Sequence, residues 1–304
     1  FPERNESSML FVTNIEKSFG ARTLFSGLSF ILNAGDRVGI IGRNGTGKTT
    51  LLEIIAGHAE VDGGEISLQK GATIGYLEQS LEATPGKTLL AEVAGASERL
   101  ERLEHKRTLI HERLASLGPG GEHDTLLAEL GEIESHYDHL GGYTLEYEAK
   151  AILTGLGFKE NDFDRDLTEF SGGWRMRAGL AKLLLSEPDI LMLDEPTNHL
   201  DLDAVVWLEG FLNGYAGAVI VISHDRRFLN RMVNRIIAFE PDGVKLYRGN
   251  YDSYLVQREK EREVLEATVK NQERYIETQQ RFIERFRAKN TKSTQVQSRI
   301  KRLE

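Results

Sequence analysis

One glycine-rich segment constrains the fold more than any other part of this chain. Gly42-Arg-Asn-Gly-Thr-Gly-Lys48-Thr49 fits the pattern GxxxxGK followed by Ser or Thr. An apolar run, Val38–Ile41, precedes it, and a stretch of helical character, Lys48–Ala56, follows it. Glycines let the backbone turn tightly enough for several N–H groups to face one anion, and the start of a helix adds partial positive charge. The segment therefore predicts a strand–loop–helix unit that holds phosphates.

Two side chains of this loop suit nucleotide chemistry. Lys48 is a mobile cation that would reach the β- and γ-phosphates, and the hydroxyl of Thr49 would bind Mg²⁺. A chance glycine turn is the alternative, but the strand before the loop and the helix after it favour the phosphate loop. The predicted nucleotide-binding residues here are Gly42, Arg43, Asn44, Gly45, Thr46, Gly47, Lys48, Thr49 and Thr50.

A pair of carboxylates ends a second apolar run. Ile190-Leu-Met-Leu193 is followed directly by Asp194 and Glu195. At the tip of a buried strand, the first carboxylate can hold the hydration shell of Mg²⁺, and the second can orient or deprotonate an attacking water. A solvent-exposed acidic strand end is the alternative. The intact phosphate loop favours the catalytic interpretation.

Short apolar runs alternate with helical patterns along much of the chain, which is typical of an α/β layer with a mostly parallel sheet. Leucines at helical spacing among charged residues predict a helical hairpin formed by Thr88–Leu117 and Thr125–Leu140 and joined by a Gly/Pro turn. The expected strands are Met9–Ile15, Leu28–Leu32, Val38–Ile41, Glu65–Leu68, Thr73–Leu77, Asp189–Leu193, Ala218–Ile222 and Arg235–Phe239.

After Gly249 the pattern predicts one long polar helix. Its apolar side chains recur near coiled-coil spacing and form a narrow seam with polar interruptions. The members of this seam are Leu265, Val269, Gln272, Ile276, Gln279, Ile283 and Phe286.

Charge is distributed unevenly. The formal net charge of −9 argues against nucleic acid as a general partner, yet from Arg281 to Leu303 there are eight basic residues and one acid, Glu284. Basic side chains neutralise phosphates, so this basic tip is a candidate RNA contact, with a solvated coiled-coil turn as the alternative. The residues expected to make the contact are Arg285, Arg287, Lys289 and Lys292.

Composition excludes several classes of site. The chain has no cysteine, which removes disulfides and thiolate metal sites and fits a reducing, cytoplasmic location. Its apolar runs fall short of the roughly 20 residues needed to cross a bilayer. The first eight residues are polar, and we interpret them as a tail.

Further motifs identify a family resemblance. Ser171-Gly172-Gly173, the run from Asp194 to Asp201 (DEPTNHLD) and Ser223-His224-Asp225 are together similar to the marks of ATP-binding-cassette ATPases. The strings EPTNHLD and FSGGWRMR and the basic extension ending QSRIKRLE resemble the ABC-F branch more narrowly. That branch comprises cytoplasmic proteins of two cassettes joined by a helical linker, which act on ribosomes.

The resemblance implies roles for single residues. Phe19 would stack on adenine, although it could equally be a core residue at a strand end. Gln79 would touch Mg²⁺ and the attacking water, Glu195 would be the catalytic base, and His224 would contact the γ-phosphate. Asp201 would couple the two ATP sites. The helix start formed by Ser171, Gly172 and Gly173 would bind the γ-phosphate of ATP held by an opposite cassette, so one chain would hold two incomplete half-sites. Phe170 and Trp174 depart from the commonest form of this motif.

The expected fold class is α/β, an ATP-binding-cassette P-loop fold. It would combine a mostly parallel core sheet, an antiparallel β subdomain, a helical signature subdomain with an arm insert, and a coiled-coil-like linker helix. The expected division is a tail at 1–8, the first part of the nucleotide-binding core at 9–94, the arm at 95–142, signature helices and the rest of the core at 143–249, and a linker at 250–304.

Three functions remain open at this point. The resemblance favours a MgATP-driven clamp whose partners are a second cassette, in the same longer chain or by homodimerisation, and the ribosome with its rRNA and tRNA. The second is the ATPase motor subunit of a membrane transporter, which needs neither the basic linker nor EPTNHLD. The third is a binding module gated by ATP, in which hydrolysis only resets the protein.

Overall fold

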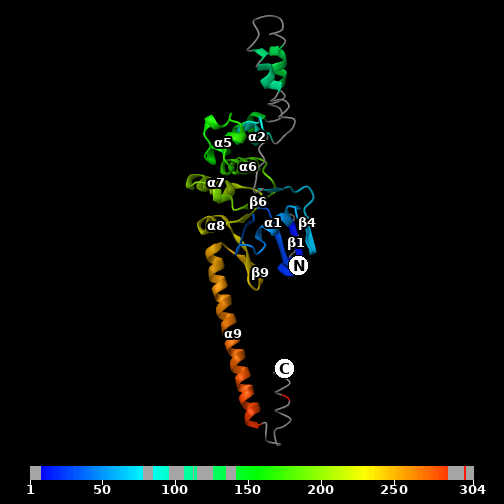
Figure 1. Ribbon diagram of the computed structural model, residues 1–304, viewed down its shortest axis with the longest axis vertical. Coiled ribbons are helices and arrows are strands. Elements are labelled where there is room, and N and C mark those ends of the chain that lie inside the picture. The colour runs from blue at the N-terminus through cyan, green and yellow to red at the C-terminus, as the bar shows by residue number, and fades with distance from the viewer. Residues whose placement is uncertain are drawn as a thin grey trace. The chain divides into compact units, whose positions relative to one another are not determined.

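The computed structural model (Figure 1) describes residues 8–77, 85–95, 106–111, 113–114, 126–134, 142–286 and 298. The chain divides into two units, Phe1–Tyr251 and Asp252–Glu304. The first unit holds both sheets and all the candidate catalytic residues that the structure describes.

A six-stranded sheet forms the centre of the first unit, in the order β5-β6-β7-β3-β8-β9. All pairs are parallel except β8 with β9. The central strands are continuous apolar runs because helices cover a parallel sheet on both faces; every residue of β7 is buried. The strands are β3 (Arg37–Gly42), β5 (Ile74–Tyr76), β6 (Ile190–Asp194), β7 (Ala218–Ile222), β8 (Arg235–Glu240) and β9 (Gly243–Arg248).

A second, antiparallel sheet has the order β2-β1-β4, with bounds β1 Ser8–Phe19, β2 Arg22–Asn33 and β4 Gly63–Leu68. Residues of both sheets and of α1 (Lys48–Ile55) share one apolar core, which includes Leu10, Leu51 and Ile220. The core sheet and the antiparallel subdomain confirm the expected fold class.

Five further helices of the body of the first unit lie among the residues that the structure describes. They are α2 (Leu89–Ala94), α5 (Gly142–Gly155), α6 (Gly172–Leu185), α7 (Leu202–Gly214) and α8 (Arg226–Met232), with short 3-10 turns η1 (Glu160–Asp162), η2 (Leu167–Glu169) and η3 (Pro196–His199). The helices α2, α5 and α6 contact one another and form the helical subdomain.

Some boundaries differ from the sequence predictions. A continuous helix from Thr88 is wrong, because α2 is capped by the Thr88 side chain at one end and closes at Gly95, which is its C-cap. The strands β1 and β2 are longer than predicted because they pair as a hairpin up to Phe19 and Arg22. The sequence analysis did not predict strand β9. This strand lies at the edge of the sheet and pairs only with β8, so it needs fewer apolar side chains than the central strands.

Two helical pieces of the arm are described. Residues 106–111 and 113–114 pack against residues 126–134 through Ile110, Leu126, Leu130 and Ile133, all of them buried. This contact agrees with a helical hairpin. Leu100, Leu103 and Leu117, which contributed to the pattern, lie outside the described residues.

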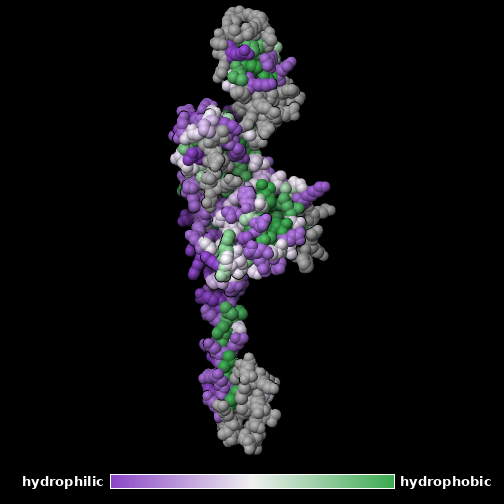
Figure 2. Space-filling model, turned by 45° about the vertical axis from the view of Figure 1, so that its right-hand side comes forward, coloured by the Kyte–Doolittle hydropathy of each residue, from purple (hydrophilic) through white to green (hydrophobic). Residues whose placement is uncertain are grey.

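The second unit contains α9 (Tyr251–Phe286). Leu265, Val269 and Ile276 of the predicted seam are exposed, and Figure 2 shows hydrophobic side chains along the otherwise hydrophilic surface of α9. Of the four predicted RNA contacts, Arg285 lies at the end of α9, and Arg287, Lys289 and Lys292 lie outside the described residues. In the described part of the chain, no helix combines the length and the apolar character needed to cross a membrane.

Candidate nucleotide site

The site forms where three neighbouring parallel strands end. β3 leads into the glycine-rich loop, β6 ends at Asp194, and β7 is followed by Ser223 and His224. Because β6, β7 and β3 are adjacent in the sheet, their carboxyl ends bring these residues together. Ligands of open α/β sheets bind at such an edge.

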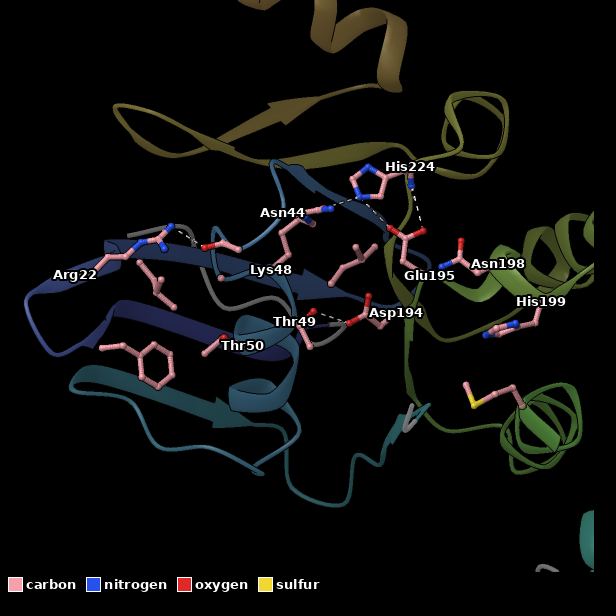
Figure 3. Close-up of a pocket in the computed structure, with 16 residues that line it drawn as sticks. Arg22, Asn44, Lys48, Thr49, Thr50, Asp194, Glu195, Asn198, His199 and His224 are labelled. Carbon is pink, nitrogen blue, oxygen red and sulfur yellow. Dashed lines mark hydrogen bonds and ion pairs between the residues drawn. The ribbon is translucent and has the colours of Figure 1, made fainter. Parts of the chain in front are cut away.

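A pocket of about 750 Å³ opens at this edge (Figure 3). Its lining comes from the β1–β2 hairpin, the glycine-rich loop with the start of α1, helix α6, the end of β6 with the residues after it, and the end of β7. Five segments of the sequence therefore meet at the pocket. Its lining consists of Phe19, Arg22, Leu24, Asn44, Gly45, Gly47, Lys48, Thr49, Thr50, Met176, Asp194, Glu195, Asn198, His199, Ile222 and His224.

Two side chains of the glycine-rich segment donate hydrogen bonds to its own backbone. Lys48 Nζ donates to the carbonyl oxygens of Gly42 at 3.1 Å and Arg43 at 3.0 Å, and Thr46 Oγ1 donates to Arg43 O at 2.9 Å. A Cβ on Gly42 would lie 2.7 Å from Phe239 Cβ, and the residue has φ 154°, so a larger residue would displace the loop. Burial lowers the pKa of the Lys48 ammonium, while Glu195 and Asp194 oppose this effect. A phosphate would give Lys48 a stronger partner than two carbonyls.

The residues present fit a magnesium ion. Thr49 Oγ1 donates to Asp194 Oδ2 at 2.7 Å, which places a hydroxyl and a carboxylate side by side next to the loop (Figure 3). Mg²⁺ usually keeps several waters and takes one or two protein oxygens together with substrate phosphates. This explains why the described residues contain no cluster of three or more His, Asp or Glu side chains able to hold a metal.

Glu195 occupies an unusual position. Its backbone is left-handed, with φ 51° and ψ 50°, and its side chain is 20% exposed. Among the residues that the structure describes, its buried Oε1 has no hydrogen-bond partner, although His224 Nε2 lies 3.4 Å away. Burial raises the pKa of the Glu195 carboxyl, and the nearby His224 and Lys48 oppose the rise. A carboxylate with one oxygen free of hydrogen bonds and a raised pKa, beside a candidate phosphate site, is suited to accept a proton.

His224 lies between the loop and Glu195. Its Nε2 is 3.2 Å from Asn44 Oδ1, and its backbone N–H donates to Glu195 Oε2 at 3.4 Å. The ring therefore faces both Asn44 of the glycine-rich loop and the candidate base Glu195 (Figure 3). Its side chain is 59% exposed, so an incoming ligand can reach it.

The adenine-binding prediction concerns the tip of the β1–β2 hairpin. Phe19 is 60% exposed and lines the pocket, with Lys17 Nζ 5.7 Å from the centre of its ring. A ring this exposed contributes little to the core and is available for stacking on a base. Arg22, on the opposite strand of the hairpin, donates to Gly45 O at 2.8 Å. Sequence reasoning missed Arg22, because the predicted strands ended at Ile15 and began again at Leu28 and so did not indicate that Phe19 pairs with Arg22.

The signature residues lie elsewhere. Ser171 is the N-cap of α6, and Ser171 and Gly172 are exposed. The described pocket lining includes Met176 from this helix but not Ser171, Gly172 or Gly173. Asp201 caps α7 by accepting from Ala204 N at 3.0 Å. Gln79 lies outside the described residues. The structure thus brings together the loop, Phe19, Asp194, Glu195 and His224, and it places the signature residues outside their own chain's pocket.

Comparison with known proteins decides the family. A family model described as ABC transporter matches residues 25–198, which is more than half of the chain. The chain belongs to the ATP-binding-cassette family. An extension model with the same description matches residues 237–304. The resemblance stated from the motifs is confirmed, and cassettes of this family bind ATP with Mg²⁺.

Curated relatives of this cassette extend beyond it. The chain is 38% identical over 97% of its length to the putative ATP-binding protein YdiF of Bacillus subtilis, and covers 46% of that protein. It is also 38% identical over 97% of its length to the probable ATP-binding protein YheS of Escherichia coli, of which it covers 45%. The chain therefore spans about half the length of these relatives.

Solved structures share the cassette fold. A structure described as an ATP-binding subunit of an ABC transporter has a TM-score of 0.57 at 19% identity and covers 82% of this chain and 92% of that chain. A dimeric post-hydrolysis state of the ATP-binding cassette MJ0796 bound to ADP and phosphate has a TM-score of 0.53 at 21% identity, over 79% of this chain and 98% of that chain. At this level of identity the likeness concerns the fold.

Proposed function

We propose that this chain is a cassette of the ABC-F type that hydrolyses MgATP together with a second cassette and works as a clamp on the ribosome. One observation supports the shared chemistry above all others. The pocket contains a Glu195 carboxylate whose buried Oε1 has no hydrogen-bond partner among the described residues, while the exposed signature residues Ser171 and Gly172 are not part of the pocket lining. In this proposal a complete site would need residues of a second cassette.

In this proposal each residue of the pocket has a defined task. Lys48 would exchange its carbonyl partners for the β- and γ-phosphates, and the loop N–H groups would surround them. Mg²⁺, held by Thr49 and Asp194, would offset phosphate charge. Glu195 would take a proton from the attacking water, and His224 would donate to the γ-phosphate. Phe19 would stack on adenine, and Gln79 would help to hold the metal and the water.

In the second part of the proposal, the start of α6 completes the ATP site of the partner cassette. The N–H groups at the start of α6 belong to the orphan donors of a helix end, and in the described structure the Ser171 side chain does not cap them. They would bind the γ-phosphate of ATP on the partner cassette, which comes from the same longer chain or from a second copy. Asp201 would couple the two sites.

The ribosomal role is supported by the C-terminal part of the chain. The extension model covers residues 237–304, and the match to YheS and YdiF includes 97% of the chain, so the region with the basic tip is shared with these relatives. Contact with rRNA or tRNA would come through Arg285, Arg287, Lys289 and Lys292. A ribosomal role would place the protein in the cytoplasm.

A transporter motor is the second candidate. It is favoured by the family description and by the relative YfmM of Bacillus subtilis, an uncharacterized ABC transporter ATP-binding protein that is 35% identical over 98% of this chain.

One experiment separates the two candidates. The Glu195→Gln variant, which would retain ATP, is expressed in cells, and its distribution between ribosome pellets and membranes is measured with ATP and with ADP. ATP-dependent association with ribosomes is expected. Association with membranes and absence from ribosomes would refute the ribosomal role and favour the motor. The Lys48→Ala variant is the control, because it should lose the ATP dependence in either case.

A further inference from the structure

Arg177 of α6 connects three segments of the chain through one guanidinium group. Its Nε donates to His199 O at 2.6 Å, and its Nη1 donates to Leu156 O at 3.0 Å and to Asp201 Oδ2 at 2.9 Å. The side chain is only 10% exposed, and its Cζ lies 4.4 Å from the centre of the Trp174 ring. The group therefore joins the start of α6, the end of α5 and the loop that follows Glu195.

The surroundings are shaped around this side chain. Gly157 has φ 95°, and a Cβ at this position would lie 2.9 Å from Arg177 Nη1. Leu156 therefore offers its backbone carbonyl to the guanidinium, and the missing side chain of Gly157 leaves the space in which the guanidinium fits. Trp174, on the other side, stacks on it. A planar group with several directed donors satisfies all these partners at once, which a lysine ammonium cannot do with the same geometry.

Apolar side chains of the loop and of α6 face one another across a small space. A small cavity of about 10 Å³ lies between them, bounded by Met176, Arg177 and Leu180 from α6 and by Glu195, Pro196, His199 and Leu200 from the loop, with Leu77. A space of this size holds about one water molecule at most. The bonds from Arg177 to His199 O and Asp201 Oδ2 act together with this packing, and they fix a direction that apolar contacts alone do not.

Charge strengthens the connection. The backbone N–H of Ala204 and then the guanidinium of Arg177 hold the pKa of the Asp201 carboxyl below its usual range. Asp201 is therefore ionised at neutral pH, and its bond to Arg177 is charge-assisted.

We propose that Arg177 is a positioning residue that holds the Ser171–Gly173 helix start and the loop from Glu195 to Asp201 in one fixed arrangement. This inference rests on the proposed hydrolysis at shared sites. Within one chain, the helix start serves the partner's ATP, and the loop begins with the residue proposed to act on this chain's own ATP. Arg177 links the two half-sites, so a shift of α6 on the partner's nucleotide moves the Glu195 loop.

The test compares Arg177→Met and Arg177→Lys with a matched control, Arg165→Met. Arg165 also stacks on an aromatic ring, with its Cζ 4.4 Å from the centre of Phe170, and it also pairs with carboxylates, Asp162 at 2.8 Å and Glu169 at 3.2 Å. These partners belong to the helical subdomain and not to the loop after Glu195. Arg165→Met therefore removes similar contacts without removing a bond to the loop after Glu195.

Hydrogen exchange measures the positioning directly and needs no hydrolysis. The amides of Asn198 and Leu200 donate to Glu195 O and Thr197 O within the loop. Both should exchange faster in Arg177→Met and in Arg177→Lys than in the wild-type chain and in Arg165→Met, while the amides of β6 and β7 keep their protection. Unchanged exchange at Asn198 and Leu200 in a folded Arg177→Met protein would overturn the inference.

The rate of ATP turnover measures whether the position of the loop affects catalysis. In Arg177→Met, kcat should fall by about 5- to 150-fold, the range typical of coupling between two sites, while the Kd for ATP stays within about threefold. Arg177→Lys should recover little of the loss, because it restores charge without the fork of donors. Asp201→Asn combined with Arg177→Met should cost no more than the larger single effect. A wild-type kcat in the Arg177→Met protein would refute the link. Absence of hydrolysis in the wild-type chain at every protein concentration would refute the proposed function instead, and the exchange experiment would still decide the positioning.

Discussion

Replacing Glu195 with glutamine tests the proposed chemistry with the smallest change in shape. Glutamine has the same number of heavy atoms as glutamate, so the left-handed backbone at position 195 and the contact from the backbone N–H of His224 can persist. The change removes the negative charge of the side chain and, with it, the ability to accept a proton. ATP binding should therefore remain, since Lys48, Thr49 and Asp194 are untouched.

The expected loss of rate follows from the role of a general base. Such a group contributes about 10²–10⁴-fold, which corresponds to about 2.7–5.4 kcal/mol of activation free energy. The buried Oε1 of Glu195 has no hydrogen-bond partner among the described residues, so the amide does not break an existing bond there. We therefore expect turnover to slow by about 100-fold or more, without a loss in the free energy of unfolding.

The pKa of Glu195 adds a second readout. Burial raises this pKa above the usual value for a glutamate, which is about 4.3. A base must be deprotonated, so kcat in the wild type should fall on the acid side with a midpoint above that value, and the variant should lack this limb. A carboxyl whose pKa is raised by folding stabilises the fold below its unfolded-state pKa. That contribution is lost as the pH rises through the folded-state pKa, so at neutral pH the glutamine variant should be at least as stable as the wild type.

The assay is single-turnover hydrolysis of ATP from pH 5 to 8, with ATP affinity and thermal unfolding measured on the same preparations. Unchanged turnover in a variant that binds ATP normally would show that another group activates the water. A large loss in ATP affinity would show that Glu195 acts in binding rather than in proton transfer. An acid limb that persists unchanged in the variant would assign the titration to a different residue.

Four further outcomes are expected. Lys48→Ala should abolish or severely weaken MgATP binding in a folded protein, measured by titration calorimetry, and wild-type affinity would remove the assignment of the loop. Asp194→Asn should raise the Mg²⁺ concentration needed for half-maximal turnover, and an unchanged requirement would place the ion elsewhere. Turnover per molecule should rise with protein concentration, and high activity in a proven monomer would contradict shared sites. Neutralising the basic tip should lower the affinity for ribosomes, and the slope of log affinity against log salt concentration should flatten by roughly 0.7 per lost phosphate contact. Equal slopes for variant and wild type would leave the tip as a solvated turn. The positions to neutralise are Arg285, Arg287, Lys289 and Lys292.

The core of the site was predictable because its residues are close in sequence or fixed by strand order. The glycine-rich loop carries its own geometry, and Asp194 and His224 follow buried strands of a parallel sheet. Once three such strands are adjacent, their ends must meet. The confirmed fold class depended on the same apolar runs. The roles assigned to single residues remain predictions.

Other features depend on contacts that no local pattern encodes. Arg177 meets Leu156, His199 and Asp201, which lie on two other segments, and nothing in the spacing of one arginine in a helix indicates this. The break at Gly95 was missed because leucine spacing continued beyond it. Boundaries of β1 and β2 were set by pairing with each other, which extends strands past their apolar centres.

The exposure of the site explains why one cassette alone should hydrolyse ATP slowly. Phe19 is 60% and His224 is 59% exposed, and the pocket has a volume of about 750 Å³. Charges act strongly on a reaction only where water is excluded, because water screens them. In the described structure, Ser171, Gly172 and Gly173 do not line their own chain's pocket, so they cannot close it. A second cassette would supply both the missing phosphate ligands and the cover that excludes water. Closure and catalysis would therefore be one event, and mutations that weaken cassette association should lower kcat at dilute protein while leaving the affinity of the open site for ATP almost unchanged.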